Sequence, residues 1–130
     1  MKKYTKDALE AAGYRIENMK ITSADLSMQD HGCMSLYLTC EGGSIGFCYG
    51  GYCLGHGYLG AEEFEGSSAG MEYVMRIMDV VGVDKFSNLK GKYIRAAIKG
   101  WGDHVKIIGN IIEDKWFDSA SFFLDKKEGE

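Results

Sequence analysis

Residues 33–52 read CMSLYLTCEGGSIGFCYGGY, and this stretch decides the fold that the sequence predicts. Its first half alternates between an apolar and a more polar face, as a half-buried β-strand does. The apolar face carries Met34, Leu36, Leu38 and Cys40. Gly42 and Gly43 supply the positive φ values of a two-residue turn, and residues 44–52 form the return strand. The sequence therefore predicts an antiparallel β-hairpin closed by a pair between Glu41 and Ser44.

This turn fixes which residues face one another across the hairpin. The expected pairs on the core side are Ile45 with Cys40, Phe47 with Leu38, and Tyr49 with Leu36. On the other side they are Cys48 with Tyr37, and Cys33 with Tyr52. Cys40 and Cys48 then lie on opposite faces and cannot form a disulfide. We expect Cys40 to be a small buried hydrophobic residue.

The segments before and after the hairpin predict helices and further strands. Thr5 caps a short helix that ends at Ala12, and residues 14–28 form an interrupted strand. The one long helix spans residues 70–81 and ends before Gly82. Its expected core-facing stripe consists of Met71, Val74, Met75 and Met78, widened by Ile77 and Val81.

A second hairpin follows this helix. Residues 84–89 form a helical turn, and strands at 93–98 and 104–112 are joined by the glycine-containing turn 99–103. Asp118 caps a last helix at 119–124. The order α-β-β-β-α-β-β-α with short turns predicts an α+β fold. We expect an antiparallel β-sheet made of two glycine-turn hairpins plus an extra strand, packed by one main helix.

The bulk properties limit the function. A chain of 130 residues fits one domain, which we assign to residues 1–124, with 125–130 as a disordered tail. The net charge of −4 argues against a nucleic-acid partner. No apolar run is long enough to cross a membrane, and the first residues lack the apolar core of a signal peptide. We therefore expect a cytoplasmic protein whose four cysteines are thiols or metal ligands.

The strongest chemical candidate in the sequence is a cluster of His31, Cys33, Cys53 and His56. The hairpin would gather these residues at one end, as a tetrahedral zinc site requires. The spacings H-x-C and C-x-x-H are not those of a paired C-x-x-C site, and Cys53 points away from Cys33 unless the strand bends after Gly51. A thiol nucleophile at Cys53 would lack an orienting third group beside His56. The sequence thus predicts no cofactor and no metal, and it leans against an enzyme.

Aromatic and basic residues beside glycines fit either a binding wall for a planar, anionic ligand or an ordinary, tightly packed β-hairpin, and the sequence alone leaves both open. Eight of the eighteen glycines fall within residues 42–60 and separate Phe47, Tyr49, Tyr52 and Tyr58. Tyr49, Tyr52 and Tyr58 would stack on a base, and Arg76 or Arg95 would hold a phosphate. The full set of candidate ligand-binding residues is Asp30, His31, Tyr52, His56, Tyr58, Arg76, Tyr93, Arg95 and Trp101.

Five short segments together resemble a set of small proteins encoded by phages and prophages. They are QDHG at 29–32, GGY at 50–52, the helix 71–77 with VGV at 81–83, LKGKYIR at 89–95, and IGNIIEDKWF at 108–117. The resemblance covers roughly residues 20–117 and implies no catalytic residue. This chain has Gln29 where the phage pattern usually has Glu, and the pattern does not regularly supply Cys53 and His56.

The resemblance implies a role against host defence, in the cytoplasm of the host cell. The expected function is that of a non-enzymatic sponge, which sequesters a nucleotide-like immune signal in pockets between the subunits of a homo-oligomer. The alternatives are an inhibitor that binds a host defence protein directly, a small zinc-binding structural protein, and an enzyme acting through Cys53 or His56.

Overall fold

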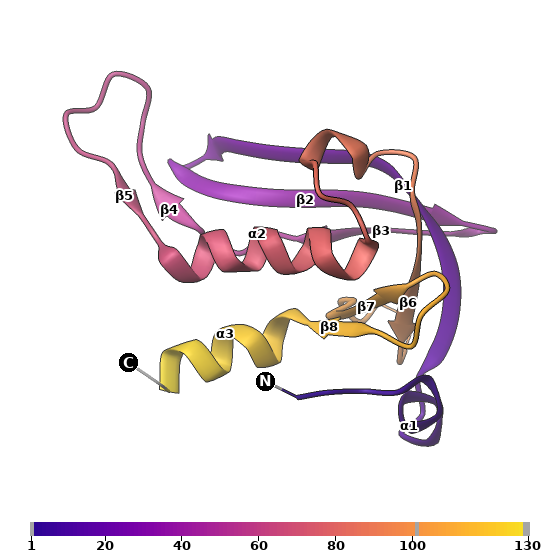
Figure 1. Cartoon of the computed structure of the whole chain (residues 1–130). Helices are drawn as coiled ribbons and strands as arrows, with labels where there is room; N and C mark the ends of the chain where they lie inside the picture. Colours follow the sequence, from indigo (N-terminus) through magenta and orange to yellow (C-terminus); the bar gives the residue numbers. More distant parts are fainter. Residues whose placement is uncertain (1, 101, 129–130) are drawn as a thin grey trace.

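The computed structural model describes residues 2–100 and 102–128 as a curled antiparallel β-sheet with helices (Figure 1). The strands are β1 (Arg15–Asp30), β2 (Cys33–Gly42), β3 (Ile45–Gly50), β4 (Gly55–His56), β5 (Glu65–Gly66), β6 (Tyr93–Ile98), β7 (Ile107–Asn110) and β8 (Trp116–Asp118). The helices are α1 (Lys6–Ala11), α2 (Ser68–Val81), α3 (Ser119–Glu128) and the 3₁₀ helix η1 (Phe86–Asn88). None of these described helices is both long and apolar enough to cross a membrane. The expected α+β class is confirmed.

β1 is the strand that joins the two halves of the sheet. From Arg15 to Lys20 it pairs with β6, and from Lys20 to Asp30 it pairs with β2. The register shifts between Ile21 and Ser23. Such a bulge bends a strand and increases its twist, and in Figure 1 β1 curves from the β2 side to the β6 side. The strand order is β5-β4-β2-β1-β6-β7-β8, with β3 beside β2.

The hairpin of β2 and β3 forms as expected, but its register is displaced. Gly42 pairs with Ile45, so the turn consists of Gly43 and Ser44, and the predicted pairs are wrong. The observed core-side pairs are Leu38 with Tyr49 and Cys40 with Phe47. The cause is a close approach: a Cβ atom at Gly42 would lie 2.4 Å from the carbonyl oxygen of Asn18. Gly42 is therefore needed inside the strand.

The predicted faces of this hairpin are still correct, because the cross-strand partner of each residue changes by two positions and alternate residues share a face. Cys40 is buried and Cys48 is exposed, on opposite faces of the hairpin. Burial raises the pKa of the Cys40 thiol to about 12. Cys40 thus behaves as the buried, unreactive residue that the sequence predicts.

α2 packs on the sheet with a face that the sequence predicts only in part: Ile77 and Val81 are buried, and Val74 and Met78 pack against the core. Its buried residues are Gly70, Tyr73, Ile77, Val80 and Val81. Met71 and Met75, which the predicted stripe placed in the core, are 62% and 61% exposed. Tyr73 decides the orientation, because it packs against Phe117 and Phe123 with ring centroids 5.8 and 4.9 Å away. Both partners come from the C-terminal quarter of the chain.

Replacing both exposed methionines of α2 tests this face. We expect Met71→Gln with Met75→Gln to change the free energy of unfolding by less than about 0.5 kcal/mol, since surface substitutions rarely do more. The half-buried Met78 packs against the core, and Met78→Gln is the matched control that should cost more. Urea unfolding followed by circular dichroism measures both. A large loss of unfolding free energy in the double variant would show that Met71 and Met75 face the core, as the sequence predicts.

The C-terminal region contains a strand and a longer helix than the sequence predicts. β8 was not expected, and it pairs with β7. Asp118 caps α3 as predicted, because its Oδ1 accepts a hydrogen bond from the Ser121 amide at 3.1 Å. The helix passes the expected end at Leu124 and continues to Glu128, where a disordered tail was expected from Asp125. Lys126 anchors this extension through an ion pair with Glu72 at 2.7 Å.

Other elements agree more closely with expectation. β6 has the predicted bounds, and β1 and η1 lie where a strand and a helical turn were expected. α1 begins after Thr5, whose hydroxyl accepts a hydrogen bond from the Ala8 amide at 3.1 Å. β7 is shorter than the predicted strand 104–112, so the connection from β6 is longer. The two-residue strands β4 and β5 were not expected at all.

Candidate functional site

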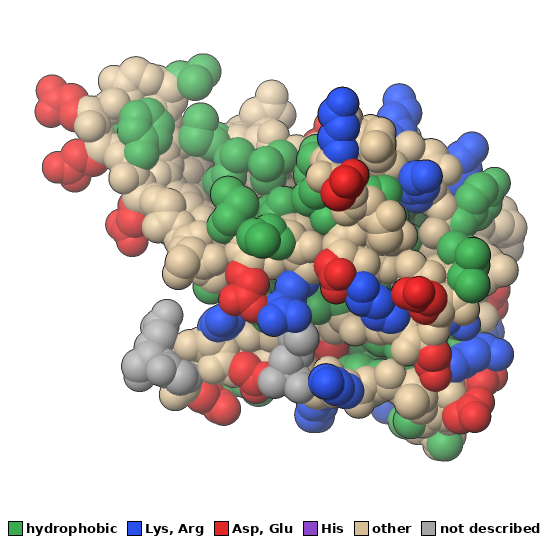
Figure 2. All heavy atoms as spheres, viewed as in Figure 1, with side chains coloured by type: hydrophobic (Ala, Val, Ile, Leu, Met, Phe, Trp, Pro, Cys, Tyr) green, Lys and Arg blue, Asp and Glu red, His purple; other side chains and the backbone are tan. Residues whose placement is uncertain are grey.

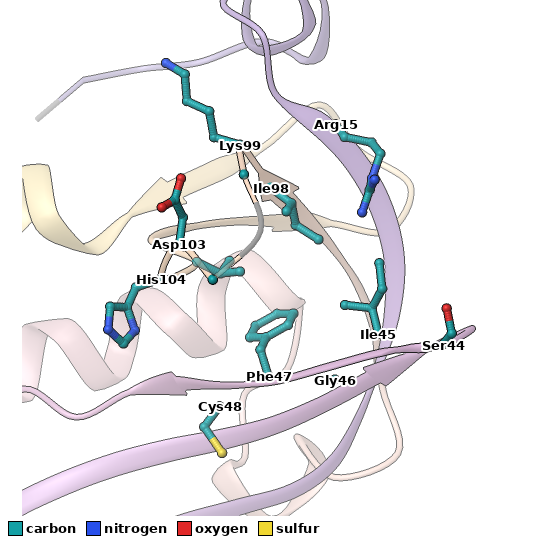
Figure 3. A pocket seen from close by; sticks show the side chains of 13 residues that line it. Arg15, Ser44, Ile45, Gly46, Phe47, Cys48, Ile98, Lys99, Asp103 and His104 are labelled. Carbon is teal, nitrogen blue, oxygen red and sulfur yellow. The ribbon is translucent and has the colours of Figure 1, made fainter.

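A slot opens between β3 and the connection from β6 to β7 (Figure 3). Its volume is about 660 Å³. Within residues 2–100 and 102–128, β3 pairs with β2 alone, so its second edge borders the slot. The sheet curls far enough to bring β3 near the end of β6 and the β6–β7 connection, and the slot is the space that remains between them.

The floor of the slot is apolar. It consists of Ile45, Phe47, Ile98 and Val105, which are all half-buried and pack against the main core. Figure 3 shows Phe47 and Ile98 directed into the space, while Cys48 points to the other side of β3. An aromatic ring on the floor offers a flat surface for a planar group.

One wall of the slot is backbone. Gly51 donates a backbone hydrogen bond to Leu36 at 3.2 Å, and in an antiparallel pair such bonds recur at every second residue. The residues Ile45, Phe47 and Tyr49 therefore bond toward β2. The amide and carbonyl groups of Gly46 and Cys48 face the open edge and remain available to a ligand.

Arg15 supplies positive charge at one end of the slot. In Figure 3 its side chain reaches toward Ile45, whereas Lys99 points away from the cavity. Glu17 Oε1 lies 2.8 Å from Arg15 Nε. The Arg15 side chain is 54% exposed and the Glu17 side chain 38%. Lys99 instead lies over the Tyr14 ring, with Nζ 4.9 Å from the centroid. An anionic group in the slot would meet Arg15 first.

The tyrosines nominated by the sequence lie elsewhere. Tyr49 is fully buried, and burial raises its pKa well above the usual value. Tyr52 stacks on Phe123 with ring centroids 4.5 Å apart, and its hydroxyl lies 3.2 Å from the Ser119 hydroxyl. Both tyrosines therefore belong to the aromatic core between α2 and α3. Neither offers a free face for stacking on a base.

The nominated arginines are engaged in contacts within the fold. Arg95 donates from Nε to the carbonyl of Asn110 and from Nη2 to the carbonyl of Glu113, both at 2.7 Å. Its guanidinium also lies over the Trp116 ring, 4.8 Å from the centroid. Arg76 pairs with Glu72 at 2.7 Å. The pKa of Glu72 is lowered by Lys126 first and by Arg76 second.

The other nominated residues are scattered over the surface. Tyr93 is 54% exposed on β6. Asp30 and His31 interact with each other, with Oδ1 and Nδ1 2.7 Å apart, at the turn between β1 and β2. Trp101 lies outside the described residues. Of the nominated residues that the structure describes, none lines the slot.

A second candidate site gathers three of the four residues proposed for zinc. Cys33 at the start of β2 is the cross-strand partner of His56 in β4. The ligand atoms of Cys33, Cys53 and His56 all lie within 4.8 Å of one another. Cys53 Sγ lies 3.5 Å from His56 Nε2. A hydrogen bond with Cys53, and then burial, raise the pKa of the Cys33 thiol.

The bend that this cluster requires occurs at two glycines. Gly50 and Gly51 have φ values of 122° and 92°, so the chain leaves the line of β3 and returns beside the start of β2. Leu54 then donates a backbone hydrogen bond to Met34 at 2.7 Å. His31 does not join the cluster; its side chain is 94% exposed.

Exposed apolar residues mark a third feature. Figure 2 shows hydrophobic side chains gathered over α2 and the β4–β5 connection. The exposed large residues in these segments are Tyr58, Leu59, Phe64, Met71 and Met75. Leu59 is 92% exposed. We call this set the apolar patch.

Comparisons with known proteins give no relative: no family model, no curated protein and no solved structure matches the chain.

Proposed function

We propose that this protein is a non-enzymatic binder of a small, nucleotide-like anion, and that the slot beside β3 is its binding site. The observation that carries the proposal is the slot itself: a concave space with an apolar, partly aromatic floor and a polar rim that includes Arg15, Asp103 and His104. Ligand pockets of proteins have a similar volume and also combine apolar walls with polar groups that orient the ligand. The resemblance to small phage and prophage proteins supports a sponge that sequesters an immune signal of the host.

Each part of a nucleotide has a counterpart in the slot. The Phe47 ring would stack on the base, and the open backbone groups of Gly46 and Cys48 would bond to its edge. Arg15 would hold a phosphate, because a guanidinium binds phosphate through two parallel hydrogen bonds. This site replaces the one predicted from the tyrosines, and it lies within one subunit.

A ligand panel tests the proposal. We expect at least one cyclic nucleotide or ADP-ribose derivative to raise the melting temperature of the full chain, without being converted to product. Arg15→Gln should weaken binding of that ligand by about 10-fold or more, as expected for a lost hydrogen bond to a charged group. Calorimetric titration measures the affinity, and chromatography of the recovered ligand tests for turnover.

Arg76→Gln is the matched control, because Arg76 is also partly exposed and also paired with a glutamate. We expect it to leave the affinity unchanged. The proposal fails if no member of the panel binds, or if the two arginine variants weaken binding equally.

The apolar patch favours a second function, the direct inhibition of a host defence protein. Soluble proteins rarely expose several large apolar side chains together unless the surface binds a partner. If the patch binds a defence protein, the unmodified chain should capture that protein from host lysate, and the double variant Leu59→Ser with Phe64→Ser should not. The slot variant Arg15→Gln should still capture it.

A further inference from the structure

We propose that Cys33, Cys53 and His56 bind one zinc ion, through the two Sγ atoms and the Nε2 atom of the imidazole. This site lies away from the slot, since none of the three residues lines that cavity. It does not depend on the proposed ligand-binding function. Two thiolates and one imidazole are ligands that zinc prefers over magnesium or calcium.

The spacing of the atoms fits tetrahedral coordination. Zinc–sulfur bonds of about 2.3 Å and zinc–nitrogen bonds of about 2.0 Å at a tetrahedral angle place sulfur and nitrogen about 3.5 Å apart. Cys53 Sγ and His56 Nε2 are 3.5 Å apart. One ligand atom from each of the three residues lies within 4.8 Å of those of the other two. The ligands therefore need only small side-chain adjustments to enclose the ion.

The backbone holds this geometry from two sides. His56 pairs with Cys33 on β2 and with Glu65 on β5. Gly57 donates a hydrogen bond to the Gly32 carbonyl at 2.8 Å. Coordinating groups on paired strands are better fixed than groups on a free loop.

Glycines let the surrounding chain close tightly on the site. A Cβ atom at Gly32 would lie 2.8 Å from the Tyr58 ring, and one at Gly57 would lie 2.3 Å from the Phe64 ring. Tyr58 also donates a hydrogen bond to the His31 carbonyl at 3.1 Å. The β4–β5 connection is thus fastened to the turn that precedes Cys33.

The fourth coordination position faces solvent, because Cys53 and His56 are exposed. Water would occupy it. A zinc ion bound by the three residues would join the start of β2 to the segment that follows the Gly50–Gly51 bend. It would thereby fix the β4–β5 connection, which carries part of the apolar patch.

Cobalt substitution tests the site directly. The full chain is reduced, freed of metal with a chelator, and titrated with Co²⁺. We expect one Co²⁺ per chain, with thiolate-to-cobalt charge-transfer bands and the strong visible bands of tetrahedral cobalt, and we expect Zn²⁺ to displace it. Competition with a chromophoric chelator then gives the zinc affinity. The absence of thiolate bands would overturn the proposal.

Ligand and control variants assign the site to these residues. Cys53→Ser and His56→Ala should each weaken zinc binding by at least about 100-fold, since even the loss of an outer-shell partner costs 10- to 100-fold. Cys48→Ser and His104→Ala remove the same residue types elsewhere and should bind zinc as tightly as the unmodified chain. Equal losses in the ligand and control variants would contradict the assignment.

Alkylation of the unmodified chain gives a test that does not depend on any variant folding. Zn²⁺ should slow the reaction of iodoacetamide at Cys33 and Cys53 but not at exposed Cys48, as read by peptide mass spectrometry. Unchanged rates at Cys33 and Cys53 would refute the site. A Cys33–Cys53 disulfide that persists under the reducing conditions and blocks zinc binding would refute it as well.

Discussion

Gly50→Ala should destabilise the protein by at least about 3 kcal/mol, the largest loss that we expect from any single methyl group added to this chain. Gly50 has a φ of 122°, a conformation that residues with a Cβ atom rarely adopt. A Cβ atom built there would also lie 2.0 Å from the carbonyl oxygen of Leu36. Neither strand can move away, because Leu36 is fully buried and its carbonyl accepts the Gly51 hydrogen bond. Urea unfolding measures the loss.

Two other glycines separate the causes of this loss. Gly60→Ala introduces an alanine at a φ of 83° with no atom within 4 Å of the new Cβ, so it should cost only the backbone strain, about 1 kcal/mol. Gly66→Ala has neither problem and should be neutral. If Gly50→Ala and Gly60→Ala cost the same, the clash with Leu36 is not the cause.

The loss at Gly50 should extend to the zinc site. Gly50 and Gly51 redirect the chain so that Cys53 and His56 meet Cys33. At a urea concentration where Gly50→Ala is still folded, we expect weaker zinc binding than in the unmodified chain. Gly66→Ala should bind zinc normally under the same conditions.

Local patterns predict the strands of this fold better than the contacts between them. Alternation in residues 33–41 is sufficient to find β2 and its buried face. Alternation does not predict the register of the hairpin. The register depends on Gly42, which lies against the backbone of Asn18 in the neighbouring strand β1, far away in the sequence. Likewise, the apolar period of α2 admits two faces, and the aromatic rings of Phe117 and Phe123 select the one with Tyr73. Neither partner is identifiable from the helix alone.

The candidate sites show the same division. The sequence groups Cys33, Cys53 and His56 and names the bend that they require, because all three flank one hairpin. It misses the slot, because that space exists only where the curled sheet brings β3 near the β6–β7 connection. The sequence predicts Ile45 and Phe47 as core residues. They are partly exposed because β3 has a second edge that borders the slot. Arg15 carries no local signal for its position at the end of this edge.

Asn110→Ala should cost about 2 to 3 kcal/mol, because its side chain makes four hydrogen bonds between three elements. Nδ2 donates to the carbonyls of Val80 and Val81 at the end of α2, at 3.0 and 3.4 Å. Oδ1 accepts from the amides of Ile112 and Glu113, both at 2.9 Å. Val80 and Val81 are buried, so water replaces the lost donor poorly. Urea unfolding measures the loss.

Asn110→Asp separates the two halves of this network. The new carboxylate keeps the acceptor for Ile112 and Glu113, but it replaces the donor with a negative charge beside carbonyl oxygens at a helix C-terminus, where negative charge is unfavourable. The carbonyls raise the pKa of this carboxyl group, whereas the two amide hydrogen bonds lower it. We expect the repulsion to be the larger effect, so that the pKa lies above the value of about 3.9 found in unfolded chains. The folded state then binds the proton more tightly, so the deficit relative to the unmodified chain is full at pH 7 and shrinks as the pH falls. A deficit that does not change with pH, measured against the unmodified chain at each pH, would show that the contacts to Val80 and Val81 contribute little. The stability would then come from the turn at 111–114 instead.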